Sequence, residues 1–401
     1  MDIGVVKLVL VAGAFQGIIL SFLLFTRTVN KHANRILSVL LVLLSVHIML
    51  VAFDEQAFFM KFPHLSHVSW LIPTLMGPLI LIYVQRITLA TPHFRKTELL
   101  YFIPFVIWLI CLLPYFMKPA EFKREYLNDY AASIKDDFGS LNEILNYVLL
   151  LFFGLSIFVY HQHKRRIVEF YSNISKVRLK WLGQFLYLAF IVLIVSIFGF
   201  YGRKYEIPLL KELYPYHFVS VVFLIYWTGY KAFAQPEIFG RKAEYEEAIT
   251  SAQKEESINV EINTSEEKND LAQSTTQRSG MDLGKRLKMA EELERLMIQE
   301  KLFLNSELTI QDLTEKLDTS RQYISEILNG QLGKNFYDFI NDYRIEEFKR
   351  KVVNPKKQNL TLLSLALESG FNSKATFNAV FKKKTGSTPS EYFKLVKSTI
   401  N

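Results

Sequence analysis

Cysteine is almost absent from this sequence, and several chemistries are excluded with it. Cys111 is the single cysteine among 401 residues, so the chain can form neither an intrachain disulfide nor a cysteine-rich zinc site. The sequence also lacks histidine pairs at metal-ligand spacing beside an acid, glycine-rich phosphate loops and a nucleophile elbow. These absences predict a protein that is not an enzyme and that holds no metal or other cofactor.

Apolar side chains, by contrast, are in excess. Half of the residues are hydrophobic, 33 are phenylalanine, and the mean hydropathy is +0.15. This composition excludes a disordered or fibrous chain and favours membrane segments. Runs of about 20 apolar residues, enough to cross a bilayer, lie at 5–26, 34–54, 66–87, 98–117, 142–162, 181–201 and 213–234. Residues 1–236 are therefore predicted to form a seven-helix transmembrane bundle in the lipid bilayer.

The charges of the connecting loops predict how this bundle is oriented. The first, third and fifth loops are basic, and the fifth has Glu169 as its only acid, whereas the second and fourth loops mix acids with bases. Because lysine and arginine stay on the cytoplasmic side, we expect the odd-numbered loops and the C-terminal part inside, with the N-terminus outside. The first run has no basic stretch before it and no cleavage site, so we expect no removal as a signal peptide.

His47 is a polar exception within the apolar half. It lies near the middle of the second run, where an ionisable side chain is a candidate for sensing a signal. The simpler interpretation, which we favour, is a neutral histidine bonded to a neighbouring helix. Paired broken helices, which are typical of many transporters, are not evident in the hydropathy pattern. The sequence therefore suggests a sensor but identifies no signal ligand.

Residues 237–280 differ sharply from the bundle, because they are polar, acidic and almost free of aromatic side chains. Such a segment buries too little apolar surface to offset its ordering entropy, which predicts a flexible cytoplasmic linker. A helix is predicted at 283–300, where apolar residues recur on one stripe. The stripe consists of Leu287, Ala290, Leu293, Leu296 and Met297.

The last part of the chain, 281–401, contains an internal repeat with an offset of 53 residues. Corresponding positions are Ser320 and Ser373, Gly333 and Gly386, Asn335 and Thr388, and Asp338 and Glu391. Each copy has the pattern of a short helix, a tight turn, a second helix and a capped third helix, with helix-start signals at Thr309 and Thr388. Two short helices joined by a tight turn form a helix-turn-helix. We therefore predict an all-α tail with a double helix-turn-helix, whose core covers 302–396.

The second helix of each copy has an apolar stripe that determines its outward face. The stripes are Ile324, Ile327 and Leu328 in the first copy and Phe377, Val380 and Phe381 in the second. Outward side chains of a recognition helix read base edges in the major groove of double-stranded DNA. The predicted readers are Arg321, Gln322, Ser325, Glu326, Lys374, Ala375 and Asn378. Lys382, Lys383 and Lys384 follow them and are predicted to neutralise phosphates.

The run SLALESGFNSKATFNAVFKKKTGSTPSEYF at 364–393 resembles the C-terminal signature of the AraC/XylS family of bacterial transcription regulators. Residues 308–352 are similar to that family's first helix-turn-helix and connecting helix. The resemblance implies that two motifs reach successive major-groove faces, and by position it supports the same readers. Family members often have an arginine where Ala379 stands and a basic or neutral residue where Glu326 stands. The GPLILIYV run at 77–84 resembles the membrane regions of membrane-bound regulators of this type.

Together, these features favour a one-component transcription regulator embedded in the bacterial inner membrane. Its transmembrane domain would sense a signal, and its tail would bind promoter DNA sequence-specifically in the cytoplasm. A homodimer formed through 283–300 is one way to transmit the signal. The alternative is a multi-pass receptor or transporter whose helical tail binds a protein partner. Binding of the tail to duplex DNA distinguishes the two hypotheses.

Overall fold

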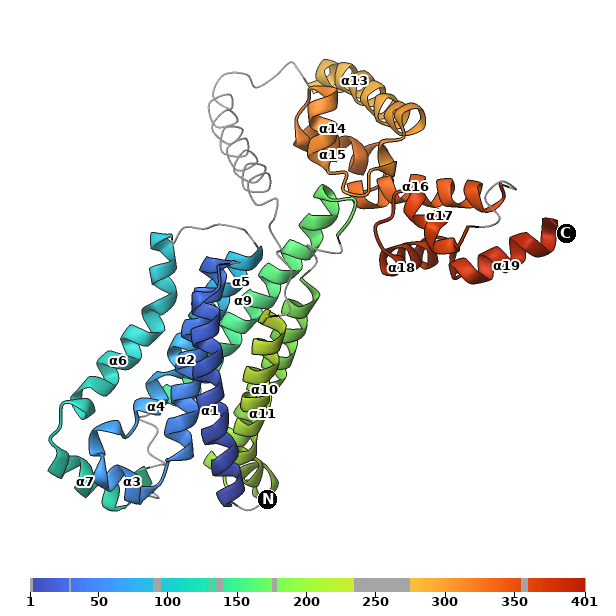
Figure 1. The fold of residues 1–401 in the computed structure, drawn as a ribbon. Helices are drawn as coiled ribbons and strands as arrows, with labels where there is room; N and C mark the ends of the chain where they lie inside the picture. The colour runs from blue at the N-terminus through green and yellow to red at the C-terminus, as the bar shows by residue number, and fades with distance from the viewer. Residues whose placement is uncertain are drawn as a thin grey trace. The chain divides into compact units, whose positions relative to one another are not determined.

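The computed structural model describes residues 3–28, 30–88, 95–129, 132–133, 140–174, 179–233, 275–354 and 360–400. The chain divides into two compact units. The first consists of 1–163 and 179–242, and the second consists of 164–178 and 243–401. All regular elements among the described residues are helices, as Figure 1 shows, which confirms the all-α class.

The first unit is a bundle of long helices. They are α1 (Ile3–Thr26), α2 (Lys31–Ala52), α5 (Pro73–Thr88), α6 (Ile103–Phe116), α9 (Leu141–Phe170), α10 (Lys180–Lys204) and α11 (Pro208–Phe233). Shorter elements precede or connect them: α3 (Gln56–Lys61), η1 (Pro63–Leu65), α4 (Val68–Leu71), η2 (Lys96–Phe102) and α7 (Ala120–Asn128). Figure 1 labels most of these helices, and the elements follow the predicted apolar runs in order.

Six helical segments in the described part of the chain are long and apolar enough to cross a bilayer. They are Gly4–Thr26, Lys31–Ala52, Pro63–Thr88, Lys96–Phe116, Leu141–Phe170 and Lys180–Lys204. α11 has 26 residues and packs against α1 and α10. Its first half carries Lys211, Glu212 and His217, and it is not among these six segments. The seventh crossing therefore stays a prediction.

Buried apolar side chains from α1, α2, α5, α9, α10 and α11 form one continuous core in the first unit. α1 and α11 approach closely, because a Cβ built on Gly13 would lie 2.4 Å from a methyl carbon of Val222. Small residues allow such close packing between membrane helices. The second and fourth loops, predicted only as loops, contain α3 and α7. These pack together, and the Gln56 side chain donates to the Leu127 carbonyl at 2.9 Å.

The second unit contains the predicted double helix-turn-helix. Its elements are α13 (Thr275–Arg295), η3 (Leu296–Glu300), η4 (Leu302–Leu304), α14 (Ile310–Leu317), α15 (Arg321–Gly330), α16 (Phe336–Val352), α17 (Leu362–Glu368), α18 (Lys374–Thr385) and α19 (Pro389–Ile400). In Figure 1, α16 connects the α13–α15 group to the α17–α19 group. The helix expected at 283–300 begins at Thr275, so the last part of the predicted linker 237–280 is helical. Residues 237–274 of that linker lie outside the described residues.

The 53-residue repeat corresponds to equivalent local geometry in its two copies. Ser320 and Ser373 cap α15 and α18, each hydroxyl accepting from a backbone N–H at 3.2 Å. The helix start predicted at Thr309 is a capping box in the structure: the Asp312 carboxylate accepts from the Thr309 N–H at 2.7 Å. The same reciprocal bonds join Thr388 and Glu391. These caps satisfy backbone donors that a helix start leaves unpaired, which determines where each helix begins.

Two apolar cores hold the second unit together. One lies between α13, α14, α15 and the start of α16, and the other between α16, α17, α18 and α19. Ala290, Leu293, Leu296 and Met297 are buried in the first core as predicted. Leu287, also predicted for this stripe, is 49% exposed, because the buried face of α13 begins one turn later. α13 is therefore part of the first helix-turn-helix core.

Candidate nucleic-acid interface

α15 and α18 present the predicted outward faces. Ile324, Ile327 and Leu328 of α15 have no exposed surface, and Phe377, Val380 and Phe381 of α18 are also buried. On the opposite faces, the exposed residues are Gln322, Glu326, Lys374, Ala375, Asn378 and Lys382, while Arg321 and Ser325 are half-buried. The helix faces therefore follow the apolar stripes, while what the outward side chains bind stays a prediction.

The outward face of α18 is open to a ligand. Lys374 and Asn378 are exposed at the start and middle of the helix. Neither side chain makes a hydrogen bond or ion pair with another described residue. An asparagine amide offers a donor and an acceptor together, and a lysine offers three donors. This face can therefore accept and donate hydrogen bonds without first breaking internal ones.

The outward face of α15, in contrast, is engaged within the unit. The Gln322 amide donates to Glu326 at 3.1 Å, and Glu326 also lies 3.9 Å from the guanidinium of Arg286 in α13. The Asn329 amide donates to the Ser325 hydroxyl at 3.3 Å. Hydrogen bonds and ion pairs between exposed side chains are weak. They therefore orient these side chains but can be exchanged for hydrogen bonds to a base edge.

Arg321 has a contact that the sequence did not predict. Its guanidinium lies over the Phe170 ring, 4.5 Å from the centroid, and Glu169 lies close enough to attract it. Both partners come from residues 164–174, which we call the docked segment: the end of α9 and the following residues, which belong to the second unit. A guanidinium on an aromatic face gains about 0.5–2 kcal/mol. The docked segment therefore covers one predicted reader of α15.

The docked segment is anchored through Ser172. Its N–H and its hydroxyl both donate to the Leu308 carbonyl, at 3.2 and 2.6 Å, just before α14. The Ser172 carbonyl accepts from Arg344 at 3.0 Å and from Asn341 at 3.3 Å. Tyr171 also forms an isolated antiparallel bridge with Thr309. These bonds are buried, so they hold the segment more firmly than a surface contact would.

Arg344 is the centre of this anchor. Its five N–H donors are all used, for the carbonyls of Phe303, Asn305 and Ser172, the Ser172 hydroxyl and the Asn341 side chain. Burial lowers the pKa of Arg344 to about 10, so the guanidinium stays charged at neutral pH. Sequence reasoning missed Arg344. It lies three and four residues from Asn341, Ile340 and Phe348, which are all buried, and that core position within the helical pattern was a usable signal.

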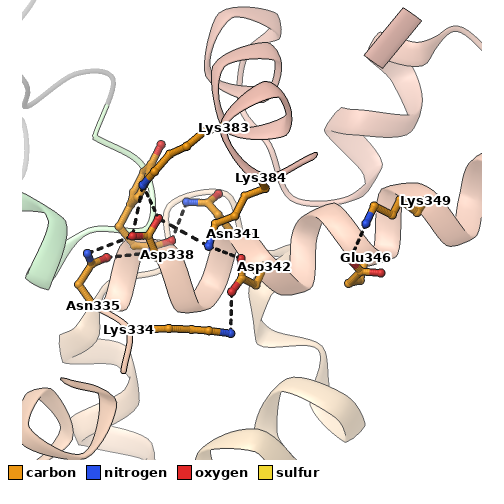
Figure 2. A network of polar contacts seen from close by, with 10 residues as sticks. Lys334, Asn335, Asp338, Asn341, Asp342, Glu346, Lys349, Lys383 and Lys384 are labelled. Carbon is orange, nitrogen blue, oxygen red and sulfur yellow. Dashed lines mark hydrogen bonds and ion pairs between the residues drawn. The ribbon is translucent and has the colours of Figure 1, made fainter. Parts of the chain in front are cut away.

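The three predicted phosphate-binding lysines are not equivalent (Figure 2). Lys383 lies 3.0 Å from Asp338, and Lys384 lies 2.5 Å from Asp342, so both pair with acids of α16. Lys334 also reaches Asp342, at 2.7 Å. Lys382 has no such ion pair with a described residue. Lys383 and Lys384 therefore join α18 to α16, and Lys382 is the lysine of the three that is best placed to neutralise a phosphate.

The ion pairs of Asp342 allow a test of the contact between α18 and α16. Burial alone would raise its pKa, but the ammonium groups of Lys334 and Lys384 lower it overall. A lowered pKa contributes stability above the ordinary carboxyl range, and that contribution is lost as pH falls through the lowered value. We expect Asp342→Asn to cost about 1 kcal/mol of local stability at pH 7 and progressively less below about pH 4.

Hydrogen exchange of the α18 amides in the full-length protein, under mild urea, measures that difference. Glu346→Gln is the matched control, because Glu346 pairs with Lys349 on the exposed side of α16 (Figure 2). It should cost less than about 0.5 kcal/mol. An Asp342→Asn deficit that is equal at pH 7 and pH 3 would contradict the ion-pair account.

The C-terminal part of the chain is similar to known proteins. Residues 313–395 match a family model described as a helix-turn-helix domain. An uncharacterized HTH-type transcriptional regulator of Staphylococcus aureus (strain COL) is 32% identical over 91 residues, 23% of this chain and 12% of that protein. The uncharacterized HTH-type transcriptional regulator YobQ of Bacillus subtilis (strain 168) is 36% identical over 85 residues, 21% of this chain and 34% of YobQ.

A solved protein of unknown function from Listeria innocua is similar at 25% identity, covering 27% of this chain and 95% of that one, with a TM-score of 0.23. The match to the two regulators spans about an eighth and a third of their lengths. Together with the helix order, the family match shows that the C-terminal domain is an AraC-type helix-turn-helix domain.

Proposed function

We propose that this chain is a membrane-embedded transcription regulator that binds promoter DNA sequence-specifically through α15 and α18. The observation that carries the proposal is the pair of capped helices with equivalent outward faces, within a domain that matches a helix-turn-helix model. The regulators that it resembles bear the name HTH-type transcriptional regulator. Six membrane-capable segments in the same chain support the membrane location.

Each outward side chain has a role that its chemistry suits. Arg321 and Gln322 can read guanine and adenine edges from α15. Lys374 and Asn378 can do the same from α18, with Ala375 available for a thymine methyl group. Lys382 neutralises phosphate, which adds affinity without sequence information. Promoter specificity then comes from two helices that read separate stretches of one groove.

The proposed orientation has the N-terminus outside and the DNA-binding domain in the cytoplasm. The basic fifth loop supports it, and so does the docked segment, because residues 164–174 belong to the same unit as α14–α19. Alkaline phosphatase fused after residue 240 should therefore be inactive, and a fusion after residue 129 in the fourth loop should be active. The reverse pattern of activities would overturn both the orientation and the DNA-binding function.

Signal control is proposed to act through the docked segment. Phe170 and Glu169 hold Arg321 away from a base edge, and both lie at the end of α9, a membrane-capable helix. A signal that displaces this end would free Arg321. The exposed side chains of Leu283 and Leu287 on α13 offer an apolar strip for a homodimer, which would place two such domains on paired half-sites.

Chromatin immunoprecipitation of the full-length protein tests the function directly. We expect a small set of enriched sites that share a motif, and we expect the enrichment to disappear for Asn378→Ala with the protein still in the membrane. A protein that is cross-linked to no DNA, but that captures one cytoplasmic protein through α15 and α18, would favour the partner-binding alternative.

A further inference from the structure

The first unit contains a cavity of about 280 Å³ between α2, α4, α5, α9, α10 and α11. Most of its lining is apolar, from residues such as Leu41, Met76, Leu149 and Ile225. Ligand sites in proteins have volumes of about 300–1,000 Å³ and are mostly apolar with a few well-placed polar groups. The cavity is slightly smaller than that range, which suits a molecule smaller than a typical drug.

Three polar side chains in the cavity wall have a buried atom without a hydrogen-bond partner in the described structure. These atoms are His47 Nδ1, Asn146 Nδ2 and Thr228 Oγ1, from α2, α9 and α11. Leaving a buried polar atom unpaired costs free energy, so native structures nearly always supply a partner. His47 and Asn146 each lie five residues from the end of the bundle where α2 ends and α9 begins, whereas Thr228 lies 20 residues along α11. The first two atoms therefore indicate a molecule bound near that end of the cavity.

The types of these atoms define the chemistry of that molecule. The His47 ring lies near the Ser69 backbone, and its unpaired Nδ1 accepts a hydrogen bond when the ring proton is on Nε2. The Asn146 nitrogen is a donor. A hydroxyl group on the ligand can satisfy donors and acceptors together, whereas a carboxylate only accepts and is costly to desolvate. The remaining wall requires an apolar body.

We propose that this cavity binds a small neutral amphiphile, an apolar molecule that carries a hydroxyl group. Asp54, Asn142 and Arg203 line one end of the cavity, where α2 and α10 end and α9 begins. Under the proposed orientation that end faces outside, so the ligand enters from there. α9 contributes Asn146 to the wall and Phe170 to the docked segment, and one helix therefore connects the ligand site to the control of Arg321. The connection to Arg321 rests on the proposed function, whereas binding of the amphiphile to the cavity does not.

The test uses full-length protein in lipid nanodiscs and a photoactivatable 1-octanol with a diazirine on its alkyl chain. We expect cross-links in peptides of α2, α9 and α11 that line the cavity, as identified by mass spectrometry. Excess 1-octanol should reduce this labelling at least fivefold, and equal concentrations of n-octane or octanoate should not. Equal competition by n-octane, or labelling confined to lipid-facing residues, would overturn the proposal.

Three variants sharpen the result. Asn146→Leu should lower cavity labelling at least fivefold, and Gln184→Leu, which removes an exposed amide from α10, should leave it unchanged. Ala189→Phe keeps every polar group but fills the cavity, so it should also abolish labelling. Because it removes no polar side chain, this variant tests the site independently of any misfolding caused by Asn146→Leu. Unchanged labelling in Ala189→Phe would contradict the site. Titration with duplex DNA in the absence of octanol tests the proposed function separately.

Discussion

Replacing Asn378 with alanine is expected to cost about 1–3 kcal/mol of binding free energy on the cognate duplex, or roughly 5- to 150-fold in affinity. The reason is the position of Asn378: it is exposed in the middle of α18, opposite the buried Phe377, Val380 and Phe381. Its amide has no competing internal bond with a described residue. Titration of the full-length protein against cognate and scrambled duplexes measures the loss, which should appear on the cognate duplex alone.

Two lysines provide the matched controls for this reader. Lys382→Ala should weaken both duplexes equally and lower the slope of log affinity against log salt by about one. Lys384→Ala should change that slope less, because Asp342 already pairs with Lys384 at 2.5 Å. An Asn378→Ala loss of equal size on both duplexes would mean that α18 contacts only the DNA backbone. Equal slope changes for Lys382→Ala and Lys384→Ala would contradict the assignment of Lys382 to phosphate binding and of Lys384 to the contact with α16.

Replacing Phe170 with leucine is expected to raise the affinity of the full-length protein for its cognate duplex by about 1 kcal/mol, or roughly fivefold. Leucine keeps apolar packing against the first core but removes the aromatic face under Arg321. Arg321 is then freed more often to reach a base. The same titration measures the gain, and Glu346→Gln, which removes an acid distant from Arg321 in sequence and pairs locally with Lys349, controls for a general charge effect.

A double-substitution cycle isolates the proposed contact. Arg321→Ala should lower cognate affinity by about 1–3 kcal/mol, and Phe170→Leu should add nothing in that background, because its effect passes through Arg321. A gain from Phe170→Leu that persists without Arg321 would show that the docked segment acts elsewhere. An unchanged affinity in Phe170→Leu alone would show that the segment does not compete with DNA.

Local patterns predicted the elements of the second unit well, because caps and apolar stripes depend on residues three or four positions apart. Thr309 shows this, since α14 begins after it as predicted and Asp312 completes a capping box with it. The open face of α18 was also readable, because Phe377, Val380 and Phe381 determine it locally. Long apolar runs likewise predicted six helical segments that are long and apolar enough to cross a bilayer.

Contacts between distant parts of the chain could not be predicted in this way. Arg344 and Ser172 are separated by 172 positions, and no local pattern pairs a serine in a loop with a buried arginine. The engagement of Arg321 by Phe170 depends on the same docking. The pairing of Lys383 and Lys384 with α16 was missed because a run of lysines looks like a solvated, phosphate-binding face when read alone.

We propose that this chain binds DNA sequence-specifically while it is embedded in the membrane. The most direct test is a titration of the full-length protein in nanodiscs against a duplex identified by chromatin mapping and against a scrambled duplex, at several salt concentrations. We expect the cognate duplex to bind at least about 10³-fold more tightly, with both affinities falling as salt rises. Equal affinity for the two duplexes, or no binding while α14–α19 remain protected from hydrogen exchange, would contradict it.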